Sequence, residues 1–421
     1  MTSEQGPQQA FVWVWLPDET EPVVAGRLSV DTAGNLAFNY GRSYLERIND
    51  RPGAISLYLP ELPLRPGMLP LLSGLTMPSC LRDSAPDAWG RRVIINRKLG
   101  LRGADTDTAV LDEMTYLLES GSDRIGALDF QHSATEYEPR YAKNVEMEEL
   151  LHSAEKVDKG VPLTAELDQA LFHGSSIGGA RPKALIEEQG KKYIAKFSAS
   201  NDLYSVVKAE FIAMRLASLC GLDTAPVRMT KAGGKDILLI DRFDRVRTEK
   251  GWSRKSMVSA LTLFGLDDMM ARYASYEDLA EIIRQRFEAP KESLKELYSR
   301  LCFNILCGNT DDHARNHAAF WNGESLCLTP AYDICPQGRA GNEATQAMLI
   351  SGNNRYSQRS ACLDSAHNFL LSRQEATGIF DRQIALIEQH WDAVCDEAEL
   401  SEIDRKFFWK RQFLNPFVFE S

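Results

Sequence analysis

Residues 308 to 317, GNTDDHARNH, place two aspartates, two histidines, an arginine and two asparagines between two apolar runs. Asp311 and Asn316 have the spacing Asp-x-x-x-x-Asn of the kinase catalytic loop, in which the aspartate accepts the substrate hydroxyl proton and the asparagine binds a metal. Asp333, in LTPAYDICP, can supply a second ligand, because Mg²⁺ needs few protein ligands besides phosphate oxygens and water. The pattern predicts Asp311 as the catalytic base and Asn316 and Asp333 as metal ligands.

The same stretch allows other interpretations. His313 and His317 are four residues apart and could face one zinc ion, but HARNH lacks the glutamate of the motif H-E-x-x-H. We therefore expect His313 to brace the loop around Asp311 within the nucleotide site. Asp312 is an alternative base, although the spacing to Asn316 favours Asp311. A lone Asp-Asp pair is by default a helix N-cap.

A glycine-rich stretch, HGSSIGGARPKALI, occupies residues 173 to 186. Gly178 and Gly179 let the backbone approach an anion closely, and a run of free N–H groups can cradle phosphate. The stretch matches neither the Walker A pattern nor G-x-G-x-x-G. Taken alone, it is most simply a hairpin turn.

A lysine and a glutamate follow this loop in the order that a kinase requires. Lys196 stands in the strand pattern KKYIAKFSA, and Glu210 lies on the apolar stripe of the next helical pattern. A buried carboxylate needs a partner, and a strand lysine is the nearest candidate. A Lys–Glu pair beneath a glycine-rich loop holds the phosphates of ATP in kinases. Either residue alone could equally be an ordinary surface charge.

The first region of the chain, to about residue 140, is rich in strand patterns. Its segments predict strands at FVWVWLP, GRLSVDTAGNLAFNY (two strands around a turn at Gly34-Asn35) and AISLYLP, an ordered irregular loop at PELPLRPGMLPLLSG, and helices at APDAWGRRVIINRKLG and DTAVLDEMTYLLES. The polar segment SATEYEPRYAKNVEMEE predicts a domain boundary.

The remaining chain divides into a small β-rich region and a large helical one. Residues 160 to 245 predict strand, strand, helix, strand, strand, with a hairpin turn at Gly190 and a helix end at Gly221. Long helical patterns dominate after Thr248. We therefore expect an α+β chain with a two-lobed, protein-kinase-like fold, divided at 1–140, 141–247 and 248–421. At 421 residues, two or three domains are expected.

Composition narrows the class of protein further. Hydrophobic residues make up 44% and charged residues 25%, as in a globular protein, and the net charge of −11 argues against a general nucleic-acid-binding surface. The first residues resemble no signal peptide, and no apolar run is long enough to cross a bilayer. The eight cysteines form no C-x-x-C pair, and Cys220, Cys302, Cys307 and Cys395 fit reduced core thiols. A cytoplasmic protein is expected.

Several segments together carry a specific resemblance. The chain resembles the HipA family of bacterial serine/threonine kinases, the toxins of type II toxin–antitoxin modules, in SIGGARPKALI, IAKF, AEF, LLIDRFDR, NTDDHARN and PAYDICP. Its N-terminal pieces are similar to the family's N-terminal subdomain at VWVWLPD, VAGRL, FNYGRSYL, DSAPDAWGRRVI and SDRIGAL. The six kinase segments occur in the family's order and the resemblance covers almost the whole chain.

The resemblance implies a kinase-like fold with an extra N-terminal subdomain, ATP and Mg²⁺ as cofactors, and growth arrest. It implies that Lys196 holds the phosphates of ATP and that Asp241 and Phe243 offer hinge backbone groups to adenine. Ser176 matches the family's autophosphorylated loop serine, with the neighbouring Ser175 as the alternative acceptor. The implied partners are a protein substrate, which in known members is an aminoacyl-tRNA synthetase, and a helix-turn-helix, HipB-like antitoxin that carries the DNA contact.

Two departures from the family pattern stand out. Arg181-Pro182 replaces a Gln-Glu pair of the best-known member, and Asp241 stands where glutamate is familiar. Two alternatives also remain open at this level. One is a kinase of small molecules, and the other is a catalytically silent scaffold that acts as corepressor with a DNA-binding partner.

Overall fold

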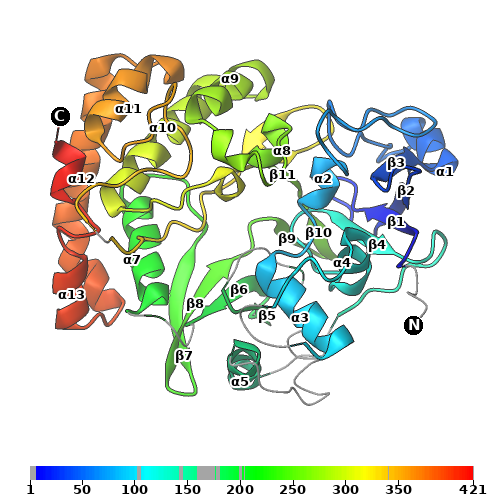
Figure 1. Ribbon diagram of the computed structural model, residues 1–421, viewed down its shortest axis with the longest axis horizontal. Coiled ribbons are helices and arrows are strands. Elements are labelled where there is room, and N and C mark those ends of the chain that lie inside the picture. Colours follow the sequence, from blue (N-terminus) through cyan, green and yellow to red (C-terminus); the bar gives the residue numbers. More distant parts are fainter. Residues whose placement is uncertain are drawn as a thin grey trace. The chain divides into compact units, whose positions relative to one another are not determined.

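The computed structural model (Figure 1) describes residues 6–101, 106–141, 146–158, 176, 181–198, 202, 204–339 and 341–420. The chain forms two compact units that are described separately below. Unit 1 consists of Met1–Asn201, Lys231–Val258 and Trp321–Glu324, and unit 2 consists of Asp202–Thr230, Ser259–Phe320 and Ser325–Ser421. The α+β class predicted from the sequence is confirmed. The division at residues 140 and 247 stays a prediction.

Unit 1 begins with an antiparallel sheet of order β3-β2-β1-β4. Its strands are β1 (Gln9–Val14), β2 (Val23–Val30), β3 (Leu36–Tyr40) and β4 (Leu128–Gln131). The predicted β2–β3 hairpin is confirmed: Gly34 takes a φ of 85°, and the Asp31 carboxylate accepts the N–H groups of Ala33 and Asn35 at 2.8 Å each. Local side-chain bonds of this kind favour a turn over strand continuation.

The strand predicted at residues 54 to 60 is wrong. Only an isolated bridge, between Tyr58 and Leu62, forms there. Side chains take the place of a strand partner, because the Tyr40 hydroxyl donates to the Leu62 carbonyl at 2.7 Å and accepts the Leu57 N–H at 2.9 Å. The ordered irregular loop that follows is confirmed, with Leu62 and Leu69 buried.

Short helices accompany this sheet. They are α1 (Arg42–Glu46), η1 (Arg47–Asn49), α2 (Ser79–Arg82), α3 (Ala88–Leu99) and α4 (Glu113–Glu119), followed by α5 (Met147–Asp158). Gly100 closes α3 in the left-handed conformation that only glycine adopts easily, with a φ of 65°.

A second sheet, of order β5-β6-β8-β7, follows the predicted pattern strand, strand, helix, strand, strand. The elements are β5 (Lys183–Glu188), β6 (Lys191–Phe197), α7 (Val206–Leu219), β7 (Val227–Ala232), which crosses from unit 2 into unit 1, and β8 (Lys235–Asp241). Gln189 and Gly190, with φ of 52° and 73°, form the predicted tight turn of the β5–β6 hairpin. The short strands β9 (Arg245–Thr248), β10 (Gly251–Arg254) and β11 (Ser256–Ser259) come next.

One face of the second sheet forms a hydrophobic core. Ala195, Phe197 and Leu239 on this face pack with Trp89 of α3 and Leu151 of α5. Because side chains alternate along a strand, Lys196 projects from the other face. The sheet therefore separates a packed side from a side that carries polar groups.

Unit 2 is mainly helical (Figure 1). Besides α7 it contains α8 (Ala260–Phe264), η3 (Ala271–Tyr273), α9 (Tyr276–Arg286), α10 (Pro290–Cys307), η4 (Ala314–Asn316), β12 (Ala318–Trp321), which ends in unit 1, β13 (Leu326–Leu328), α11 (Arg359–Ser365), η5 (Ala366–Phe369), α12 (Arg373–Glu397), α13 (Glu402–Phe408) and η6 (Pro416–Phe419). Serine caps begin α9 and α12, and Ser372 with Glu375 forms a complete capping box.

The central helix of this unit, α10, is buried along most of its length. The core thiols predicted from the sequence are confirmed, since Cys220, Cys302, Cys307 and Cys395 are buried and free. Burial raises the pKa of Cys307 and of Cys395 to about 12, so both stay protonated and unreactive at neutral pH. In the part of the chain that the structure describes, no helix is both long enough and apolar enough to cross a membrane.

Gly308 at the end of α10 gives the first prediction. It has a φ of 73°, and a Cβ added there would lie 2.7 Å from the Gln412 carbonyl oxygen. We expect Gly308→Ala to lower the free energy of unfolding by at least the roughly 1–3 kcal/mol of left-handed strain, and further through the clash. Urea unfolding of the full chain measures it. The control is Gly352→Ala, where φ is 53° and a Cβ meets nothing within 4 Å. Equal losses in the two variants would contradict the clash.

Candidate functional site

The polar stretch GNTDDHARNH forms a loop that starts at the end of α10. Gly308 caps the helix in the left-handed conformation, and the Asn309 N–H donates to the Asn304 carbonyl at 2.8 Å. The two side chains repeat this link, because Nδ2 of Asn309 donates to Oδ1 of Asn304 at 3.0 Å. The 3₁₀ turn η4 closes the loop before β12. The loop is therefore fixed to a rigid helix end.

The two adjacent aspartates of the loop have different surroundings. Asp311 is exposed, whereas Asp312 is only 2% exposed. The Asp312 carboxylate accepts the hydroxyl hydrogen of Tyr276 and lies 3.0 Å from Nε2 of His317. A buried carboxylate requires such partners, because removal from water is costly. Asp312 thus holds the loop from inside the unit, and Asp311 is the aspartate that a substrate can reach.

Asn316 is linked directly to the residue that it is expected to serve. Its side-chain Nδ2 donates to the backbone carbonyl of Asp311 at 3.2 Å. This bond fixes the amide orientation and leaves the Oδ1 oxygen as the group suited to a hard cation. The spacing of five residues therefore has a structural meaning: it closes the loop between Asp311 and Asn316.

Asp333 lies in a segment that is attached to both ends of this loop. The Tyr332 hydroxyl donates to the Arg315 carbonyl at 2.7 Å, and the Gln337 N–H donates to the Gly308 carbonyl at 3.0 Å. Asp333 has a φ of 59°, a left-handed conformation that Asp tolerates better than most residues. The segment is thus positioned to bring a second carboxylate to the loop.

His317 braces the loop, and the bracing role predicted for His313 stays a prediction. Nδ1 of His313 is buried and has no hydrogen-bond partner among the described residues. His317 contacts Asp312 through its ring and accepts the Ala260 N–H on its carbonyl at 2.7 Å. The zinc interpretation gains no support, because His317 is directed at Asp312. Within the described ranges, no three His, Cys, Asp or Glu side chains gather as a metal site.

In unit 1, Lys196 lies on the sheet face opposite the core. It is 9% exposed and pairs in register with Lys183 of β5 and Leu238 of β8. Directly paired residues share a face of the sheet, so two buried lysines stand side by side there. Glu210 is buried on α7, but it belongs to unit 2. The predicted Lys196–Glu210 ion pair stays a prediction.

The expected adenine hinge is the chain that leaves β8. Asp241 ends the strand and accepts Nζ of Lys191 at 3.1 Å, while Phe243 lies in the turn that follows and is partly buried. The Arg242 N–H extends the ladder past the strand by donating to the Lys192 carbonyl at 2.8 Å. Contacts of Asp241 and Phe243 with a nucleotide remain predictions.

Sequence reasoning missed a set of charges behind this hinge. We call it the ionic cluster: Asp123, Lys192, Arg242, Asp244 and Arg245. All five belong to unit 1 and four come from chain beyond residue 190. Side-chain exposure is at most 3% for Arg242, Asp244 and Arg245. Its only signal in the sequence is weak and consists of the acid–base alternation in SDRIG and IDRFDR.

Mutual pairing decides the protonation of the cluster. Burial raises the pKa of Asp244, but Arg242 and Arg245 outweigh burial and lower that pKa to about 2. Burial likewise raises the pKa of Asp123, but the same two arginines lower it, and the pKa lies well below its usual value. Because the folded-state pKa of Asp244 lies below the unfolded one, its ion pairs stabilise the fold above about pH 4 and lose this effect as the pH falls through about 2.

Ser176 lies in the glycine-rich stretch and is among its described residues. It is 2% exposed, and its hydroxyl donates to the Asp123 carbonyl at 3.3 Å. A phosphate on this hydroxyl could not remain there, because the group carries about −1.5 to −2 charges and cannot be buried against a carbonyl oxygen. Gly178, Gly179 and Ser175 lie outside the described residues.

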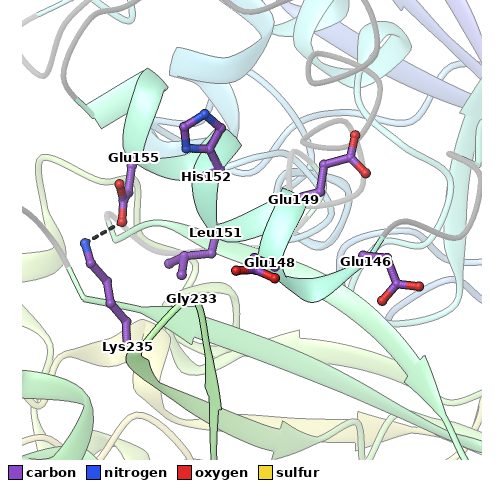
Figure 2. Close-up of a pocket in the computed structure, with 8 residues that line it drawn as sticks. All are labelled: Glu146, Glu148, Glu149, Leu151, His152, Glu155, Gly233 and Lys235. Carbon is purple, nitrogen blue, oxygen red and sulfur yellow. Dashed lines mark hydrogen bonds and ion pairs between the residues drawn. The ribbon is translucent and has the colours of Figure 1, made fainter.

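A pocket of unit 1 is lined by α5 and the β7–β8 turn, as Figure 2 shows. Four glutamates line it, and Glu155 pairs with Lys235; the glutamates are Glu146, Glu148, Glu149 and Glu155. This charge would repel a triphosphate. The pocket does not include any of the residues expected to bind the nucleotide.

Two family models match the chain. Residues 175–391 match the HipA-like C-terminal domain, and residues 14–131 match the HipA N-terminal domain. The putative kinase Y4mE of Sinorhizobium fredii is 25% identical over 338 residues, 74% of each chain. The serine/threonine-protein kinase toxin HipA of Shewanella oneidensis is 25% identical over 186 residues, 38% of this chain and 42% of that protein.

The fold also matches a solved structure. A chain of the Shewanella oneidensis MR-1 toxin–antitoxin complex of HipA, HipB and its operator DNA aligns with a TM-score of 0.69 and 20% identity. The match covers 95% of this chain and 93% of that chain. It confirms the kinase-like fold predicted from the sequence.

The contrast between the two loop aspartates yields the second prediction. Asp312→Asn should lower the free energy of unfolding by roughly 1–3 kcal/mol, because it weakens the buried bonds to Tyr276 and His317. Asp311→Asn, at an exposed position, should change it by no more than about 0.5 kcal/mol. Urea unfolding of the two isosteric variants provides the comparison. Equal stability of both variants would show that Asp312 does not brace the loop.

Proposed function

Since the chain belongs to the HipA family of kinases, we propose that it transfers the γ-phosphate of ATP to a serine or threonine hydroxyl of a protein. The observation that carries this proposal is the loop after α10. It presents an exposed aspartate, ties Asn316 to that aspartate's carbonyl at 3.2 Å, and fixes the Asp333 segment at both of its ends. Phosphoryl transfer depends mainly on such positioning and on charge neutralisation.

Asp311 has the role of catalytic base in this proposal. It accepts the proton of the substrate hydroxyl as the oxygen attacks phosphorus, which requires a carboxylate that is reachable from solvent. Asn316 and Asp333 would hold Mg²⁺, and an amide oxygen with one carboxylate suits a cation that keeps water and phosphate oxygens as its other ligands. When bound, the metal supplies positive charge against the phosphates.

The nucleotide would be held by residues from several segments of the chain. Lys196 would contact the phosphates with Glu210 as its partner, and the backbone at Asp241 and Phe243 would receive the adenine. Gly178 and Gly179 would give the phosphates access to backbone N–H groups. His313 would contribute to the nucleotide site from the loop itself. These assignments are supported by the order of the segments along the chain and by the burial of Lys196 and Glu210.

The proposal extends to partners and to growth arrest. The structural relative was solved with HipB and operator DNA, and we propose a HipB-like, helix-turn-helix antitoxin for this chain as well. The net charge of −11 favours DNA contact mainly through such a partner. An aminoacyl-tRNA synthetase is the proposed class of substrate, and its phosphorylation would stop translation.

The third prediction concerns Asp311. Asp311→Asn should lower the rate of phosphoryl transfer by about 10²–10⁴-fold, because general base catalysis contributes this much. The measurement is transfer from γ-labelled ATP to proteins of a whole lysate. Labelled protein bands would separate a protein kinase from a kinase of small molecules, which would leave them unlabelled.

The matched control for this experiment is Asp364→Asn, an exposed aspartate of α11 whose side chain pairs with the likewise exposed Arg373 of α12 at 2.8 Å. It should keep wild-type activity.

Expression of the wild type without an antitoxin should slow growth, and expression of Asp311→Asn should not. Full labelling activity in folded Asp311→Asn would remove Asp311 from its role, and equal growth would remove the toxin function alone.

The fourth prediction is that Ser176 is autophosphorylated and that its phosphorylation inhibits the enzyme. Phosphate would expel the side chain from its buried position at the Asp123 carbonyl and so displace the loop that receives ATP. Peptide mapping of wild type should find phosphate within residues 173 to 183, and Asp311→Asn should lack it. Ser176→Asp should bind ATP more weakly than Ser176→Ala. If the phosphate maps to Ser175, or if Ser176→Asp binds ATP like wild type, this assignment is wrong.

A further inference from the structure

The ionic cluster joins two parts of unit 1 that are far apart in the sequence. One part is the segment 122–126, which follows α4, and the other is the hinge that leaves β8. Arg242 reaches across with Nη1 to the Asp123 carbonyl at 3.2 Å and with Nη2 to the Arg124 carbonyl at 2.8 Å. In return, the Gly126 N–H donates to Oδ2 of Asp244 at 2.8 Å. Both chains thus supply donors and acceptors to the junction.

The hinge is held on both sides of Phe243. Arg242 before it and Asp244 after it form a bidentate pair, with Nε–Oδ1 at 2.7 Å and Nη2–Oδ2 at 2.8 Å. Such forked pairs fix orientation as well as distance. The peptide groups around Phe243 are therefore flanked by two anchored side chains, both of which are at most 3% exposed.

Asp123 is the residue that connects the hinge to the second sheet. Its Oδ1 accepts Nη2 and Nε of Arg245 at 2.8 Å and 3.0 Å, and its Oδ2 accepts Nζ of Lys192 at 2.6 Å. Lys192 lies on β6, the strand that also carries Lys196. One carboxylate therefore couples the hinge to the strand expected to hold the phosphates.

We propose that Asp123, acting through Arg242, Arg245 and Lys192, is a positioning residue that sets the hinge backbone at 241–243 for the adenine ring. This inference rests on the proposed function and adds a role for the N-terminal region. Apolar residues of similar volume can often replace a buried ionic cluster without loss of stability. The match of donors and acceptors in this cluster indicates that it serves to set the geometry of the hinge.

The test compares nucleotide binding by Asp123→Asn and Asp129→Asn. Asp129 is a matched control, because it is also a buried aspartate, paired with Arg124 and Arg140, and no bond joins its side chain to the described hinge residues. Asp123→Asn should weaken the binding of adenosine and of ADP by the same factor, on the order of tenfold. It should leave the binding of tripolyphosphate unchanged. Asp129→Asn should bind all three probes like wild type. Calorimetric titration measures each affinity.

A milder variant guards against loss of folding. Lys192→Met removes one contact of Asp123 at a side chain that is 16% exposed, and it should weaken adenosine binding in the same direction. In Asp123→Asn, KM for ATP should rise while kcat at saturating ATP stays within about threefold of wild type.

Each outcome decides between positioning and a purely structural role. Unchanged adenosine affinity in folded Asp123→Asn or Lys192→Met would overturn the inference, and so would an equal loss in Asp129→Asn. A loss confined to tripolyphosphate would place the effect at the phosphates and would also overturn it. If wild type itself bound no adenosine nucleotide, the proposed function would fail, and this inference with it.

Discussion

The cost of removing charge from water governs both units of this chain. A buried carboxylate is tolerated only when donors surround it, so each one fixes the chains that supply those donors. In unit 2, Asp312 gathers Tyr276 and His317 and thereby sets the path of the loop. In unit 1, Asp123 gathers three cations, Lys192, Arg242 and Arg245, which lie at least 69 residues away in the sequence. The functional segments are therefore held in place by polar contacts, in addition to the packing of the hydrophobic cores.

Elements whose signals are local could be predicted from the sequence. The β5–β6 hairpin, the second sheet and the helices α9, α10 and α12 follow from turn residues and from periodicity. The strand expected at residues 54 to 60 failed for a physical reason: the Tyr40 side chain takes up the hydrogen bonds that a partner strand would have made. A pattern of apolar residues contains no information about such distant competition.

In the candidate site too, local features could be predicted and contacts between distant residues could not. The spacing of Asp311 and Asn316 was visible, because one loop carries both residues. The side-chain amide of Asn316 donates a hydrogen bond to the Asp311 carbonyl, five positions earlier. The contact of His317 with Asp312 was not visible, since it also depends on Tyr276, which lies on α9. The ionic cluster was hidden for a related reason: Asp123 and Arg245 are separated by 122 residues, and only the fold brings them within 2.8 Å.

The end of α10 has a consequence for the time at which the loop can form during synthesis. The Leu414 N–H donates to the Leu306 carbonyl at 2.7 Å, and the Gln412 backbone packs against Gly308. These contacts come from chain made roughly a hundred residues after the loop itself, which at 5–20 residues per second means a delay of about 5–20 s. A nascent chain would therefore carry an incompletely supported loop while it is still on the ribosome. The loop would reach its final form only after residues 412–414 have emerged.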